Sequence, residues 1–434
     1  MRITADYAST GNTSSHPTGL KTIRRVIEGL VIAAVMLLLI EMLARGVITM
    51  RDDFRESNDN EYILYSKELG WERRPHFSGP LTGVFLPPEP GHPIRQFDAH
   101  GFFTFDTEQA ANSKDPQIVT IGDSTTFGWG VPPQATYSEL LDSLLPDASV
   151  INLGLNGYSS YQGYKILQKY APLIRPKIII VAFNFNDRRY VLRQDGADSD
   201  VTFARGPHAQ ELRQTTEKSY LFKVVKAVIK KLGVPTAAAT SQQPAVVDDV
   251  RTLRTRVSPE HYRTNLTNIV RLAEEWDASV IFVVLKDNPA YTAHLRRGIE
   301  LFEGSHYDQA IRELQIALNL QNPFSELTRK FLATAYEKVG AVEEARGVAR
   351  LDNPHPAGKV IHTDVEYNAI MRTVAKEHGV KLVEAGQALE KDASMYLDSV
   401  HPDARGHRRI AELLHPAVIE VLAARVTQAA AHGL

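Results

Sequence analysis

Ser124 is the residue whose type and position best suit a nucleophile. It lies in the segment IVTIGDSTTFGWGV, residues 118–131, where an apolar run predicts a strand that ends in a Gly-Asp-Ser turn. Ligands bind at the carboxyl ends of parallel strands, so a serine on such a turn would present its Oγ and its own N–H to a cleft. Asp and Ser also favour turns and helix caps. Ser124 by itself therefore leaves both interpretations open.

A base for this serine is found near the C-terminus. A hydroxyl nucleophile needs a base within hydrogen-bond reach, and the base needs a group that orients it. His401 ends the run Asp-Ser-Val-His, residues 398–401, and an imidazole can take up a proton near neutral pH. Asp398 is expected to hold the other ring nitrogen, which completes a Ser-His-Asp arrangement.

Two further segments follow predicted strands and could supply hydrogen-bond donors. They are NLGLNGYS at 152–159 and NFND at 184–187. The negative oxygen that develops during acyl transfer needs fixed donors, and the Gly157 N–H and the Asn186 side chain are suitable ones. Together with Ser124, these residues predict an acyl-transfer site that requires no metal and no organic cofactor.

The other candidate residues have simpler interpretations. His355, His362 and His407 lack the spacing with carboxylates that would suggest a metal site, and we expect them at the surface or as caps. Trp129 could line an acyl or sugar pocket, or it could be a packing residue. Arg188 and Arg189 are expected to be a solvated pair, and the alternative is that they bind an anionic substrate.

Composition limits the possible classes of protein. The chain has 434 residues, of which 43% are hydrophobic and 23% charged, as in an ordinary globular protein. The net charge of −2 gives no basic field for nucleic acid. The absence of cysteine excludes disulfides, Cys-ligated zinc and a thiol nucleophile.

Apolar runs that alternate with amphipathic stretches predict the elements that position these residues. Nearly continuous runs rich in β-branched residues are typical of strands covered on both faces, and their alternation with helices favours a three-layer α/β fold with a parallel sheet. The expected strands are 117–123, 149–154, 177–184, 279–286 and 380–385, and the expected helices are 136–145, 159–174, 259–276, 364–379 and about 403–428.

Residues 26–48 are predicted to form a single transmembrane anchor. With its flanks, the apolar stretch reaches the ~20 residues that a spanning helix needs. Lys21, Arg24 and Arg25 precede it, which predicts a cytoplasmic tail at 1–25 and places the bulk of the chain in the periplasm or outside the cell. A soluble amphipathic helix and a cleaved signal peptide are the alternatives.

The catalytic domain is predicted to be interrupted, with its first part at 114–290 and its second part at 353–434. Residues 49–113 are predicted to be an irregular leader lying on this domain, and 188–257 to be loop or lid material with one amphipathic helix near 219–231. In 291–352, two stretches align at a 35-residue offset, with Ala310 on Ala345. This spacing predicts two tetratricopeptide-like repeats, which could bind a protein partner. A plain helical hairpin is the alternative.

The four polar segments resemble blocks I, II, III and V of the SGNH (GDSL-type) hydrolases, in the order of that family. The form GDSTTFGWGV also resembles the subgroup found in bacterial envelope and polysaccharide loci. The resemblance implies a flavodoxin-like sheet and catalytic roles for Ser124, Gly157, Asn186, Asp398 and His401. Block III departs from the pattern, because Asn184 stands where the family commonly has glycine.

The resemblance implies a membrane-anchored esterase whose substrate is an ester-bearing small molecule, lipid or acylated glycan. An O-acetyltransferase or deacetylase of a cell-envelope polysaccharide would carry the same residues. A non-catalytic scaffold, with the repeats recruiting a partner, is the more distant alternative.

Overall fold

A computed structural model describes most of the chain outside a few segments. The described residues are 27–29, 31–32, 35–43, 62–66, 68–80, 94–103, 117–191, 254–320, 326–349 and 364–431. The chain divides into two units, Met1–Ser57 with Arg213–Pro235, and Asn58–Leu212 with Thr236–Leu434. In the first unit, the described part of the predicted anchor is helical. Among the residues that the structure describes, no helix is long and apolar enough to cross a membrane.

A five-stranded parallel sheet forms the centre of the second unit. Its order is β11-β10-β7-β5-β6, so that the strands taken along the chain lie in the order 2-1-3-4-5. This is the flavodoxin-like order, and the prediction of fold class and of all five strands is confirmed. The strands are β5 (Gln117–Gly122), β6 (Ser149–Asn152), β7 (Ile178–Ala182), β10 (Ser279–Val283) and β11 (Lys381–Val383).

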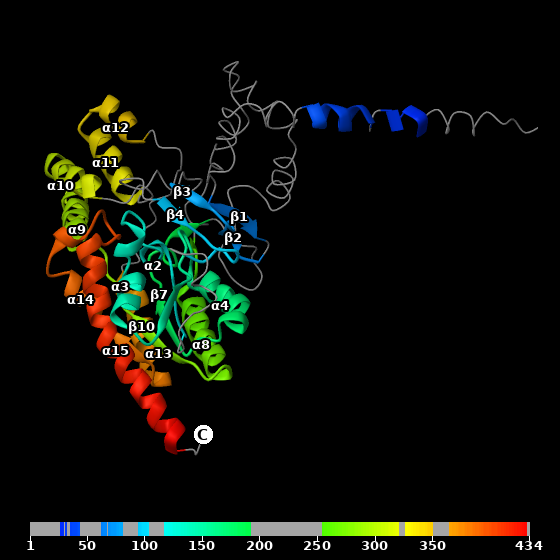
Figure 1. The fold of residues 1–434 in the computed structure, drawn as a ribbon. Helices are drawn as coiled ribbons and strands as arrows, with labels where there is room; N and C mark the ends of the chain where they lie inside the picture. The colour runs from blue at the N-terminus through cyan, green and yellow to red at the C-terminus, as the bar shows by residue number, and fades with distance from the viewer. Residues whose placement is uncertain are drawn as a thin grey trace, which may run out of the picture. The chain divides into compact units, whose positions relative to one another are not determined.

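Helices cover both faces of the sheet, as the apolar runs require (Figure 1). Successive side chains of a strand point to opposite faces, so Val119 and Ile121 pack in one core and Ile118 in the other. The first core is closed by α4 (Ser160–Ile174), α8 (Pro259–Glu275) and α13 (Asp364–His378), and the second by α3 (Tyr137–Leu144) and α15 (Ala404–Ala431).

The leader predicted to be irregular contains two small antiparallel sheets, so that part of the prediction is wrong. The pairs are β1 (Ile63–Ser66) with β2 (Gly70–Arg73), and β3 (Ser78–Pro80) with β4 (Ile94–Gln96). Each strand has three or four residues, which is too short to show a clear period of two. Leu69 and Trp71, in the described part of the leader, are buried in the first core.

The described part of the insert predicted at 291–352 lies in four helices with a small core of their own. They are α9 (Pro289–Glu303), α10 (Tyr307–Leu320), α11 (Glu326–Lys338) and α12 (Val342–Ala349). Ala310 and Ala345, which align in the sequence, are both buried. Close packing is visible at Gly298, where a Cβ would lie 2.7 Å from Leu314 Cγ. The assignment to tetratricopeptide repeats stays a prediction.

Of the insert predicted at 188–257, only the ends are described. There β8 (Tyr190–Val191) pairs with β9 (Arg254–Thr255). The helix predicted near 219–231 lies outside the described residues.

Candidate active site

Ser124 is the first residue of the short helix α2 (Ser124–Phe127), which begins where β5 ends. The Asp123 carboxylate accepts the Thr125 N–H at 2.9 Å and is the N-cap of this helix. The capping role that the sequence left open for Ser124 is thus taken by its neighbour. The turn is tight, since a Cβ at Gly122 would lie 2.6 Å from the Ala182 carbonyl oxygen.

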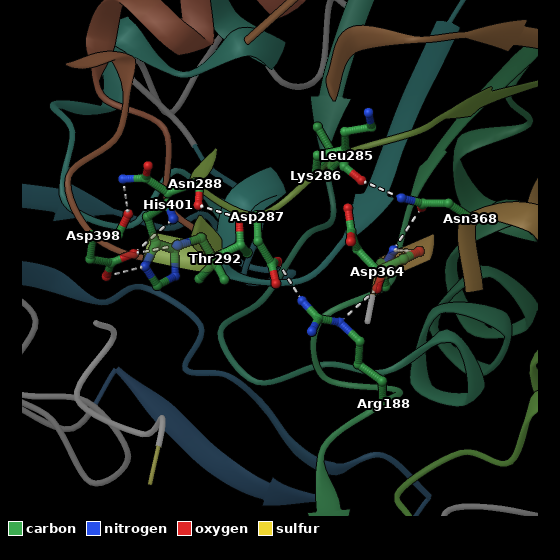
Figure 2. Close-up of polar contacts among 12 residues, drawn as sticks. Arg188, Leu285, Lys286, Asp287, Asn288, Thr292, Asp364, Asn368, Asp398 and His401 are labelled. Atoms are coloured by element: carbon green, nitrogen blue, oxygen red, sulfur yellow. Dashed lines mark hydrogen bonds and ion pairs between the residues drawn. The ribbon is translucent and has the colours of Figure 1, made fainter. Parts of the chain in front are cut away.

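A chain of two hydrogen bonds joins Ser124 to His401 and Asp398. His401 Nε2 lies 2.8 Å from Ser124 Oγ, and His401 Nδ1 lies 2.7 Å from Asp398 Oδ2. All three residues are buried. Figure 2 shows the Asp398 carboxylate directed at the imidazole. Its other oxygen accepts the N–H groups of Val400 and His401, each at 2.8 Å, which fixes the loop before α15. Such a chain can withdraw a proton from a serine hydroxyl.

Trp129 packs against the imidazole of His401. The two ring centroids lie 4.5 Å apart at an interplanar angle of 42°, and Trp129 is 5% exposed. Of the two interpretations open from the sequence, packing is therefore supported, and what Trp129 packs against is the candidate base.

Gly157 and Asn186 follow β6 and β7, the two strands that flank β5. Gly157 has φ +80°, a conformation that favours glycine. Asn186 is buried, and within the described part of the chain its Nδ2 has no hydrogen-bond partner. A buried donor of this kind requires an explanation, and a ligand oxygen would supply the missing acceptor. Asp187 links the two loops by accepting the Ser160 N–H at 2.8 Å.

Asn184, the departure from the family pattern, lies in a buried polar network with Asn368 and Arg188. Figure 2 shows these two partners. Its side chain donates to Asn368 at 2.7 Å and accepts from Arg188 Nε at 2.9 Å. Arg188 also forms an ion pair with Asp287, and both side chains are nearly buried. The prediction of a solvated arginine pair is therefore wrong for Arg188, because the asparagine at 184 gives its guanidinium an acceptor inside the fold.

Asn288 supports the loop that carries Asp398 and His401 (Figure 2). Its Nδ2 donates to the Asp398 carbonyl oxygen at 3.0 Å, and its N–H donates to the Ser399 carbonyl oxygen at 2.8 Å. Its Oδ1 accepts the Ala290 N–H as the N-cap of α9. Sequence reasoning missed this residue, because an Asn-Pro pair at a helix start has an ordinary capping explanation.

His407 is buried rather than at the surface, although it does act as a cap. Its Nδ1 accepts the N–H of Tyr137, the first residue of α3, at 3.1 Å. Burial lowers the pKa of His407 to about 3, and Arg95 and His401 add to this effect. His407 therefore stays neutral and keeps its acceptor. His355 and His362 lie outside the described residues, and the residues that are described contain no cluster of three or more metal-ligating side chains.

The similarity to known proteins extends over most of the interrupted α/β domain. Residues 120–409 match the model of the GDSL-like lipase/acylhydrolase family. No curated protein matches the chain.

Several solved structures resemble this one at low sequence identity. An α/β hydrolase from the metagenome of Lake Arreo, Spain, is 15% identical, with 70% of this chain and 95% of that chain covered and a TM-score of 0.35. A GDSL-like lipase from Bacteroides thetaiotaomicron is 13% identical, with 72% and 95% covered and a TM-score of 0.34. A mutant of an acetyl-xylooligosaccharide esterase from Geobacillus is 12% identical, with 70% and 93% covered and a TM-score of 0.34.

The family model spans both halves of the interrupted domain, from β5 to α15, and includes every residue of the hydrogen-bonded chain described above. The protein therefore belongs to the GDSL-like lipase/acylhydrolase family, the SGNH hydrolases, and is a hydrolase that acts on ester bonds.

Proposed function

We propose that the protein is a membrane-anchored serine esterase in which Ser124, His401 and Asp398 form the catalytic triad. The observation that carries this proposal is the hydrogen-bonded chain from Ser124 Oγ through both nitrogens of His401 to Asp398 Oδ2. Burial alone would raise the pKa of Asp398, but His401 and the hydrogen bonds to the carboxylate hold it below its usual value. Asp398 is thus ionised at neutral pH and can stabilise the imidazolium that forms during the reaction.

The proposed reaction proceeds through an acyl-enzyme. Ser124 Oγ attacks the ester carbonyl carbon while its proton passes to His401 Nε2. The bond from carbon to the alcohol oxygen then breaks, and His401 gives the proton to the departing alcohol. Water attacks the acyl-Ser124 ester, its proton again passing to His401, and the carboxylic acid leaves as the proton returns to Ser124.

The tetrahedral intermediates carry a negative oxygen, for which we propose three donors. They are the Ser124 N–H, the Gly157 N–H and Asn186 Nδ2. The positions of these residues support the assignment, because they follow three adjacent strands at the same edge of the sheet. Asn186 Nδ2, which has no hydrogen-bond partner among the residues that the structure describes, supports it independently.

Replacing Asn186 by alanine tests this assignment. We expect kcat for p-nitrophenyl acetate to fall by about 10²–10³, because a donor that acts mainly on the transition state is lost. KM should change little. Asn319→Ala, at an exposed position in α10, is the matched control and should behave as wild type. A variant at 186 that keeps its kcat would remove Asn186 from the proposed set of donors.

The acceptor of the acyl group distinguishes an esterase from the nearest alternative, an O-acetyltransferase or deacetylase of a cell-envelope polysaccharide. The resemblance of GDSTTFGWGV to envelope-locus sequences favours this alternative. The two possibilities separate when an acetyl donor is supplied with and without candidate glycans. Release of acetate without any glycan supports hydrolysis, whereas transfer that depends on the glycan supports the transferase.

We also propose that residues 26–48 anchor the protein in a membrane as a single span, with the catalytic domain outside the cytoplasm. Large apolar side chains support this, since Ile32, Leu38, Met42 and Leu43 are each more than 60% exposed. We expect the full chain to stay with membranes during alkaline carbonate extraction, and a variant that begins at residue 49 to be released. Equal release of both forms would contradict the anchor. Any protein partner of the helical insert would then be sought outside the cytoplasm.

A further inference from the structure

The hairpin formed by β1 and β2 holds the loop that contains Gly157. Four residues between positions 62 and 73 bond to residues between 152 and 162, and all of these bonds involve buried groups. Tyr62 Oη accepts from Asn156 Nδ2 at 3.0 Å, the Leu69 carbonyl accepts from Gln162, the Trp71 carbonyl accepts from Tyr158 Oη at 2.8 Å, and Arg73 donates to the Asn152 carbonyl at 2.8 Å. This loop therefore takes its shape largely from the leader, some 80 to 95 positions earlier in the chain.

One further bond from the hairpin reaches the peptide group that contains the Gly157 N–H. Trp71 Nε1 donates to the Asn156 carbonyl oxygen at 3.0 Å, and both groups are buried. The Asn156 C=O and the Gly157 N–H belong to one planar peptide unit, and in a trans peptide they point in opposite directions. A donor fixed on the carbonyl therefore fixes the direction of the N–H. It also polarises the unit, because hydrogen bonds in a chain strengthen one another.

The carbonyl group of Gly157 is also fixed by a hydrogen bond. Arg256 donates to the Gly157 carbonyl oxygen, and its guanidinium lies 5.5 Å from the centroid of the Trp71 ring. At φ +80°, a Cβ on residue 157 would lie 3.0 Å from Trp71 Cζ2. The indole thus contacts the glycine with its edge while its N–H holds the preceding carbonyl. Rotation of the peptide unit that joins Asn156 to Gly157 would break the bond from Trp71 Nε1.

We propose that Trp71 is a positioning residue for ester hydrolysis, which aims and strengthens the Gly157 N–H as a donor to the oxyanion. The inference rests on the proposed role of Gly157. It assigns to the leader a part in transition-state stabilisation, which acts through the Asn156–Gly157 peptide unit.

Trp71→Phe removes the indole N–H and keeps an aromatic ring in the core. The measurement is the rate at which Ser124 is labelled by a fluorophosphonate, whose phosphoryl oxygen takes the place of the oxyanion and which needs no knowledge of the natural substrate. We expect labelling to slow by about tenfold, a fraction of the effect of losing a donor outright. Trp276→Phe, the same change at the half-buried C-terminus of α8, is the matched control and should label at the wild-type rate.

The pH dependence of labelling separates positioning from general loosening of the site. In this proposal Trp71 acts on the Asn156–Gly157 peptide unit, through the bond from its Nε1 to the Asn156 carbonyl oxygen, so its loss should leave the apparent pKa of labelling unchanged. A slower rate together with a shifted pKa, or with a melting temperature far below that of wild type, would indicate loosening and overturn the inference. Labelling at the wild-type rate would overturn it as well, with the proposed function intact. Failure of the wild-type protein to label would contradict the proposed function itself and remove the basis of the inference.

Discussion

Ser124→Ala is expected to abolish ester hydrolysis, with a fall in kcat on the order of 10⁶ when the nucleophile of a triad is removed. The variant keeps the fold, because the α2 N-cap is the Asp123 carboxylate and not the serine hydroxyl. Initial rates with p-nitrophenyl acetate measure the loss. A fluorophosphonate probe measures it independently, since labelling requires the Oγ.

Ser143→Ala is the matched control for this change. Ser143 lies on the exposed side of α3, where its hydroxyl donates to the Glu139 carbonyl oxygen. It should hydrolyse and label as wild type does. Undiminished hydrolysis by purified Ser124→Ala would refute the assignment of the nucleophile. A wild-type Ser124 that resists the probe would instead favour the scaffold, in which the helical insert binds a partner and the hydrolase fold is a platform.

Asp398→Asn should lower kcat by roughly 10⁴, as expected when a triad carboxylate is replaced by its isosteric amide. The amide can keep an oxygen on the N–H groups of Val400 and His401, which now share Asp398 Oδ1. Its NH2 group then faces His401 Nδ1, which must become an acceptor, and the ring proton moves to Nε2. In that tautomer the imidazole cannot accept the proton of Ser124.

Asp403→Asn makes the same chemical change five residues later. Asp403 caps α15 by accepting the N–H groups of Arg405 and Gly406, and asparagine caps a helix about as well as aspartate does. This variant should retain its kcat.

The large loss of kcat in Asp398→Asn should diminish at alkaline pH, where hydroxide can replace the missing base. An Asp398→Asn protein with wild-type kcat at neutral pH would show that His401 does not depend on this carboxylate.

The sheet could be predicted from the sequence because its strands are buried on both faces. β7 carries a continuous apolar run and β5 a nearly continuous one, as is typical of strands covered on both faces. The strands of the leader could not be predicted from the sequence, because each has only three or four residues and owes its position to contacts with distant residues. The same limit applies to His407, whose burial depends on α3, some 270 residues away.

The residues of the candidate site also fall into two groups, those that the sequence predicts and those that only the structure reveals. Ser124, Gly157, Asn186, Asp398 and His401 were predicted because each stands in a short polar segment at a strand end or before the last helix. Trp71 and Asn288 were missed because their significance lies in bonds across 85 and 110 residues. The local sequence around Trp71, GWERRP, carries no motif. The sequence shows that Asn184 departs from the family pattern, but only the structure identifies its partners Arg188 and Asn368.

Asn288 has a consequence for dividing the chain into modules. It is the N-cap of α9, so a boundary drawn by secondary structure would assign it to the helical insert. Its hydrogen bonds to Asp398 and Ser399 assign it to the hydrolase domain instead. A shortened enzyme or a graft of these helices onto another protein should therefore be joined after residue 288. A junction one residue earlier would remove the insert together with Asn288, and the effect of losing its bonds to Asp398 and Ser399 would be attributed to the helices.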